Sequence, residues 1–171
     1  LLRSEEVYSV IHILKKRCKN VGLLLVGGGG NINQVRETAK SSRDIAITGW
    51  IKKNTDVIAY CKGSYIGVMT PRRNEMANTV SSIKCFEYVA CETPLLVTDT
   101  GEHAELVRKL NVGLVVKPNA KSIADGLEKM IRDKKLYKTF KRNCRKSKYV
   151  VDFKTTRKIF ADEICKDLGR L

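Results

Sequence analysis

The sequence contains no apolar stretch as long as the roughly 20 residues that a membrane-spanning helix needs, and nothing in it resembles a signal peptide. It lacks a C-x-x-C pair, although it holds six cysteines. We therefore expect reduced thiols in the core of a cytoplasmic protein, and neither disulfides nor a metal site. No cluster of residues requires a metal or a cofactor. An initiator Met is also missing, so we do not expect Leu1 to be the native start.

Acidic residues are scarce, with 18 Asp and Glu against 33 Lys and Arg, which gives a net charge of +15. A charge this far from balance indicates an anionic partner. The length of 171 residues fits one domain with a real core and leaves no room for a second full lobe.

The positive charge is concentrated near the end of the chain, where residues 131–160 hold twelve Lys or Arg and two Asp. Apolar residues are interspersed among them, so we expect residues 133–171 to form closing basic helices docked on the domain. Two interpretations stay open, a solvated basic face and adhesion to an anionic membrane surface at the inner face. Nucleic-acid binding comes third, because no RNA- or DNA-binding motif accompanies the charge.

Short apolar runs alternate with segments of helical periodicity along the whole chain. This alternation predicts an α/β fold with a Rossmann-like, mostly parallel sheet and helices on both faces. Sheets of this kind bind ligands beyond the carboxyl ends of their strands. The expected strands are residues 21–26, 44–48, 65–69, 94–97 and 113–116, and the expected helices are residues 1–18, 33–40, 56–61, 82–91, 101–110 and 118–133.

A glycine run at residues 27–30 follows the first expected strand. A dinucleotide-binding fingerprint needs the spacing G-x-G-x-x-G, but Ile32 or Asn33 stands where the third glycine should be. The NAD interpretation therefore fails. A tight turn without any ligand and a turn beside a bound ligand both remain open.

The stretch that organises the chain is residues 81–105, SSIKCFEYVACETPLLVTDTGEHAE. Ser81 and Ser82 can cap a helix that Pro94 ends, and a buried strand follows. The amino terminus of this helix offers unpaired N–H groups to an anion, and Lys84 adds a positive charge. Phosphate is therefore the expected ligand. Glu87 lies about one turn further along the same face, where its carboxylate can accept hydrogen bonds from ribose hydroxyls.

The string S-x-K-x-F-E-Y-x-A-C-x-x-P-L-L-V-T-D-x-G-E-x-x-E-L-V resembles the donor-binding segment of the group 1 (family four) retaining glycosyltransferases, which have the two-lobed GT-B fold. The resemblance covers nearly the whole chain. It implies the carboxyl-terminal lobe of a two-lobed enzyme, which binds a nucleotide-diphosphate sugar such as a UDP- or GDP-sugar. Transfer of a hexosyl-type sugar to an acceptor hydroxyl would then need the missing amino-terminal lobe, and the fragment alone should be inactive.

The same resemblance implies the positions of the donor contacts, whereas it names no catalytic residue. Glu87 corresponds to the ribose ligand, the turn before its helix holds the diphosphate, and Trp50 marks the place where the family contacts the nucleobase. Trp50 covering a hydrophobic edge is an equally good interpretation. The expected donor-binding residues are Gly28, Gly29, Trp50, Ile51, Thr79, Ser81, Ser82, Ile83, Lys84 and Glu87.

Other polar residues near this edge have weaker indications. Arg72 and Arg73 can approach the diphosphate or remain solvated in their loop. His12 is expected on a helix flank. His103, just after the loop at Gly101, is expected on the surface, with a position that faces the donor as the alternative.

Three departures from the family pattern qualify the resemblance. Thr79 replaces a Glu that contacts the sugar, and Glu92 replaces a Gly, which would cost about 1 kcal/mol if the backbone there is left-handed. The family's first strand and its loop with an Arg and a Lys are not in the sequence, and in a 3-2-1-4-5-6 sheet that strand is the central one. We therefore expect preceding residues in the native protein, an expectation that an intact five-stranded sheet of another order would contradict. The alternative function is a non-catalytic nucleotide-binding or basic polyanion-binding module.

Overall fold

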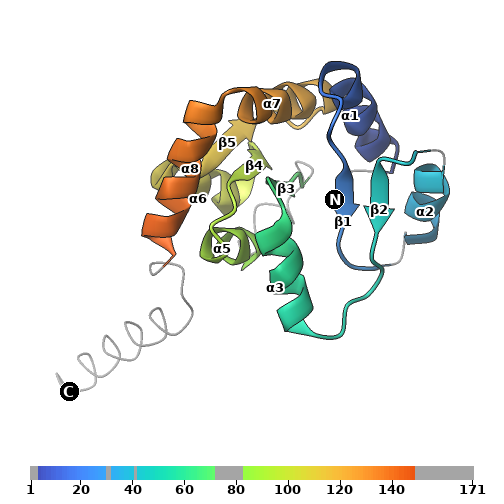
Figure 1. Cartoon of the computed structure of the whole chain (residues 1–171), viewed down its shortest axis with the longest axis horizontal. Coiled ribbons are helices and arrows are strands. Elements are labelled where there is room, and N and C mark those ends of the chain that lie inside the picture. Colours follow the sequence, from blue (N-terminus) through green and yellow to red (C-terminus); the bar gives the residue numbers. More distant parts are fainter. Residues whose placement is uncertain (1–3, 30–31, 41, 72–82, 149–171) are drawn as a thin grey trace.

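The computed structural model describes residues 4–29, 32–40, 42–71 and 83–148. Every helix and strand expected within these ranges is present, with ends that differ by a few residues, and Figure 1 shows their alternation. The helices are α1 (Ser4–Arg17), α2 (Ile32–Lys40), α3 (Asn54–Gly63), α5 (Ile83–Ala90), α6 (Gly101–Leu110), α7 (Ala120–Arg132) and α8 (Lys134–Ser147). The strands are β1 (Leu23–Leu25), β2 (Ile45–Ile47), β3 (Gly67–Met69), β4 (Leu95–Thr98) and β5 (Gly113–Val116).

The five strands form two sheets, one in the order β1-β2 and one in the order β3-β4-β5. All pairings between these strands are parallel, which confirms the predicted type of sheet. In the register, Leu24 pairs with Ala46, while Leu96 lies between Val68 and Leu114. The described residues therefore do not form an intact five-stranded sheet of another order, the arrangement that would have contradicted a missing central strand.

The core of the larger sheet is built on β4, whose residues are all buried. Because side chains alternate along a strand, Leu96 faces a cluster with Ile123 and Met130 of α7, while Leu95 and Val97 face a second cluster with α5 and α6. Helices therefore cover both faces of this sheet, as the sequence predicts.

Helix α1 connects the two sheets. Its buried Val10 and Leu14 pack in the cluster that contains Ile123 of α7, so α1 lies against α7 (Figure 1). At its end, Lys15 Nζ lies 2.8 Å from the Asp44 carboxylate, just before β2. Arg17 forms ion pairs with two acidic residues of α7. The position of β1 and β2 relative to β4 therefore depends on this helix.

Helix α8 covers the first part of the basic end of the chain, as far as Ser147, and packs on the domain. Tyr137, Phe140 and Cys144 are buried beneath it. The Tyr137 hydroxyl donates a hydrogen bond of 2.9 Å to the Tyr65 carbonyl, and the two rings stack with centroids 4.0 Å apart. The prediction for residues 149–171 lies outside the described residues. None of the described helices is long and apolar enough to cross a membrane.

The cysteines in the described ranges are free thiols, and Cys18, Cys61, Cys85 and Cys144 are buried. Burial raises the pKa of Cys61 to about 11 and the pKa of both Cys85 and Cys144 to about 12. These groups therefore stay protonated and serve as small apolar core residues.

Glu92 adopts the left-handed backbone conformation with φ of 58°, the condition under which the sequence predicts strain. Its carboxylate accepts hydrogen bonds of 2.9 Å from Arg145 and 3.2 Å from Lys148, both at the end of α8. Hydrogen bonds from Arg145 and then Lys148 hold the pKa of Glu92 below its usual value. The strained residue thereby ties α8 to the turn that follows α5.

Two substitutions at this position separate backbone strain from the ion pairs. Glu92→Ala and Glu92→Gly both remove the contacts to α8, but only glycine relieves the left-handed backbone. We expect the Gly variant to exceed the Ala variant by about 1 kcal/mol in free energy of unfolding, the reverse of the usual ranking. Urea unfolding of both variants measures the difference, and an Ala variant of equal or greater stability would contradict it.

Candidate functional site

The turns after β1 and β2 lie together at the carboxyl edge of the smaller sheet. Gly27 and Gly49 form an isolated bridge, and both have positive φ, 118° and 72°. The Gly27 amide donates a hydrogen bond of 3.1 Å to the Thr48 hydroxyl. A Cβ at Gly28 would lie 3.4 Å from the Trp50 backbone nitrogen. The structure thus brings together the predicted residues Gly28 and Trp50.

Trp50 is 80% exposed, so its indole does not cover a hydrophobic edge. Gly29 beside it has open space around its α-carbon, and Ile51 is half-buried. An exposed aromatic ring next to two glycines, which carry no side chain, is a surface on which a planar base can stack.

The second part of the candidate site is the start of α5. Lys84 Nζ lies 3.1 Å from Glu87 Oε2, and their side chains are 64% and 36% exposed. Cys85 and Val89 are buried on the opposite side of the helix. Lys84, predicted to bind the phosphate, and Glu87, predicted to bind the ribose, therefore lie on the same open face of the helix, one turn apart. Ile83, at the first position of the helix, is 57% exposed and belongs to the same open end.

Close packing fixes α5 on the sheet. A Cβ at Gly67 of β3 would lie 2.6 Å from the ring of Tyr88, so only glycine leaves room for that ring. The contact holds the helix with its amino terminus at the carboxyl edge of the strands. The predicted Thr79, Ser81 and Ser82, together with Arg72 and Arg73, lie outside the described residues.

A chain of buried polar groups follows β4. Thr98 Oγ1 donates a 3.0 Å hydrogen bond to the Pro71 carbonyl and lies 3.4 Å from the Thr100 hydroxyl. The Thr100 hydroxyl is 3.1 Å from His103 Nε2, and His103 is only 2% exposed. The surface placement predicted for His103 is therefore wrong. Its helical spacing from buried Val107, four residues later, is the signal that could have placed it inside.

The two parts of the candidate site belong to different sheets. Gly28 and Trp50 follow β1 and β2, whereas Lys84 and Glu87 lie on the helix between β3 and β4. All follow the carboxyl ends of parallel strands, the edge where such sheets bind ligands. Within the described ranges no hydrogen bond or ion pair joins one part to the other.

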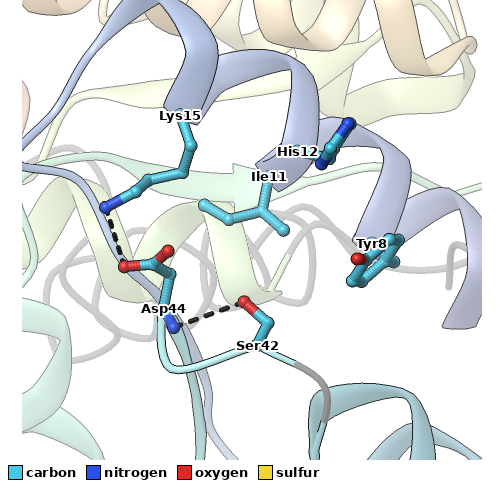
Figure 2. A pocket seen from close by; sticks show the side chains of 6 residues that line it. All are labelled: Tyr8, Ile11, His12, Lys15, Ser42 and Asp44. Atoms are coloured by element: carbon cyan, nitrogen blue, oxygen red, sulfur yellow. Dashed lines mark hydrogen bonds and ion pairs between the residues drawn. The ribbon is translucent and has the colours of Figure 1, made fainter.

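A pocket lies elsewhere, between α1 and the segment that leads into β2 (Figure 2). The rings of Tyr8 and His12 stack there at 6.0 Å, and the pair of Lys15 and Asp44 closes the other side. At about 80 Å³ it is too small for a nucleotide-sugar, and Asp44 places it at the amino end of β2. The described residues contain no group of His, Cys, Asp or Glu that could hold a metal ion.

The family model described as glycosyl transferases group 1 matches residues 4–147, most of the chain. The chain belongs to this family. A comparison with curated protein sequences gives no match.

Solved structures place this member of the group 1 family among the GT-B folds. The sucrose-phosphate synthase of Thermosynechococcus elongatus has a TM-score of 0.72 at 17% identity, covering 99% of this chain and 43% of that one. Anabaena Alr3699/HepE, in complex with UDP and glucose, has a TM-score of 0.71 at 16% identity, covering 96% and 44%. The carboxyl-terminal domain of LpcC from Francisella tularensis has a TM-score of 0.68 at 17% identity, covering 82% and 74%. The chain thus spans less than half the length of the first two proteins.

The buried His103 predicts a dependence of stability on pH. Burial lowers the pKa of His103 more than a backbone hydrogen bond to Thr98 raises it. In the unfolded chain the imidazole of His103 takes up a proton below a pKa of about 6.5, whereas in the folded chain it stays neutral to a lower pH. The free energy of unfolding therefore falls as the pH drops from about 7 towards 5. We expect the free energy of unfolding of His103→Gln to vary less over this range. Chemical unfolding at several pH values tests this, and equal slopes would contradict it.

Proposed function

We propose that this chain is the donor-binding lobe of a retaining glycosyltransferase and holds a nucleotide-diphosphate sugar at the carboxyl edge of its strands. The observation that supports this most directly is the pair of Lys84 and Glu87 on the open face near the start of α5. A cation and a carboxylate one turn apart match a diphosphate joined to a ribose. The likeness to the Anabaena protein in complex with UDP and glucose agrees with this class of ligand.

Each group has a role in the proposed complex. Lys84 and the amides at the start of the eight-residue helix α5 bind the diphosphate, because the helix dipole favours an anion there. Glu87 accepts hydrogen bonds from the ribose hydroxyls. Trp50 and the neighbouring Gly28 form the platform for the base. In the free protein Lys84 and Glu87 neutralise each other, and the ligand exchanges that ion pair for two new contacts.

Catalysis in this proposal is positional and electrostatic. The amides and Lys84 stabilise the negative charge that develops on the departing nucleoside diphosphate. The acceptor hydroxyl attacks the same face of the sugar, so the hexosyl group is transferred with retention. The described residues supply the donor side of this reaction, and the acceptor side belongs to the second lobe.

We also propose that a parallel strand from outside this sequence fits between β1 and β3. Within the described residues β1 pairs only with β2, and β3 pairs only with β4. A strand followed by α1 and then β1 would form a right-handed β-α-β unit and give one continuous sheet. The 171-residue chain alone is then expected to bind the donor and to transfer no sugar.

Calorimetric titration with UDP, GDP, ADP and the corresponding free nucleosides tests the donor site. Glu87→Ala should weaken binding of nucleosides and diphosphates alike by roughly tenfold or more, because one charged hydrogen-bond acceptor is lost. Lys84→Ala should weaken only the diphosphates. Glu37→Ala, which removes an exposed carboxylate paired with Lys40 on α2, is the matched control and should bind as the parent does.

Two outcomes would contradict this proposal. Nucleotide binding unchanged in both Glu87→Ala and Lys84→Ala would place the ligand elsewhere. Failure of all three diphosphates to bind, with binding only to polyanions that fades steeply with salt, would instead favour a basic polyanion-binding module.

A further inference from the structure

The outward side of α8 carries an unusual density of positive charge. Between residues 134 and 148 the sequence has eight Lys or Arg and no Asp or Glu. The seven of these cations that belong to α8 are all exposed. A stripe of four of them lies directly opposite the buried Phe140 at helical spacing. We call this the basic stripe: Lys135, Lys138, Arg142 and Lys146.

The basic stripe has no acidic partner among the described residues, in contrast to the flank of the same helix. Glu92 forms ion pairs with Arg145 and Lys148. Lys134 lies over the Tyr65 ring, 5.4 Å from its centroid. The structure thus neutralises or covers cations at the edges of α8 and leaves the stripe unneutralised within the described ranges.

This arrangement does not favour the helix itself. Lys138 has cations at the positions three and four residues away on both sides, and like charges at these spacings repel on a helix surface. After the capping residue Asp133, the first turn of α8 also holds Lys134 and Lys135, and the helix dipole disfavours cations there. An external anionic surface would relieve this repulsion.

We propose that the basic stripe binds the surface of a bilayer that contains anionic lipids. The stripe runs straight along the helix, so a plane of negative charge can contact its whole length at once. The two aromatic residues of α8, Tyr137 and Phe140, are buried, so the exposed face of this helix offers no ring on which a nucleic-acid base could stack. The exposed face of α8 also offers no apolar side chains that could insert into the bilayer. The proposed attachment is therefore peripheral and electrostatic.

Docking through the stripe would also orient the candidate donor site. Arg145 of α8 and Lys148 just after it form ion pairs with Glu92, which lies two residues after the end of α5. Membrane attachment does not rest on donor binding, however, and is measured without nucleotide.

The test is co-sedimentation of the full chain with phosphatidylcholine vesicles, with and without phosphatidylserine. We expect binding only to the anionic vesicles, reversed by raising the salt concentration. The triple variant Lys138→Gln, Arg142→Gln and Lys146→Gln should lower the partition coefficient about a hundredfold. The matched control neutralises Lys16, Lys19 and Arg43, three exposed cations away from α8, and should lower it by less than about tenfold.

Three results would overturn the proposal. Equal binding to neutral and anionic vesicles would show that lipid charge is not recognised. An equal loss in the stripe variant and its control would assign the effect to net charge alone. Tighter binding to duplex DNA or single-stranded RNA than to anionic vesicles at the same salt concentration would identify a nucleic acid as the partner.

Discussion

The structure depends on the packing of α1 against α7. Each sheet is small, and three of the five strands have only three residues, so neither sheet defines the domain by itself. The ion pairs of Arg17 with α7 are partly exposed and contribute little. Burial of Val10 and Leu14 in the cluster around Ile123 contributes more, at about 1.5–3 kcal/mol for each fully buried side chain. Apolar packing therefore holds the two sheets in one fold.

This constraint extends to the candidate site. Trp50 follows a strand of the smaller sheet, whereas Glu87 lies on a helix packed on the larger one. Their relative position is set by α1, far from either residue along the chain. Gly67 and the Tyr88 ring fix α5 locally, but they do not fix the distance from α5 to the turn at Trp50. In the proposed complex, recognition of a base and a ribose together would thus depend on the assembled domain.

Sequence patterns predicted the parts of the structure that depend on local signals. Periodicity and Pro94 were enough to place α5, and apolar runs located all five strands in parallel sheets. Lys84 and Glu87 fall on one open face because helical spacing alone puts them there. Features that depend on long-range packing could not be predicted from local sequence patterns. The prediction for His103 was wrong because its contact with Thr100 and its burial depend on how the turn after β4 folds. The role of Trp50 stayed open because its exposure depends on neighbours distant in sequence.

Trp50 is the single tryptophan of the chain, and it stands in water at the edge proposed for the base. Because a solvated indole emits at longer wavelength than a shielded one, the protein contains an intrinsic fluorophore at the point of interest. Its emission reports on that edge alone, with no background from other indoles and no need for a chemical label. Events at the far end of the molecule, including those at α8, would leave this signal unchanged unless they are transmitted through the fold.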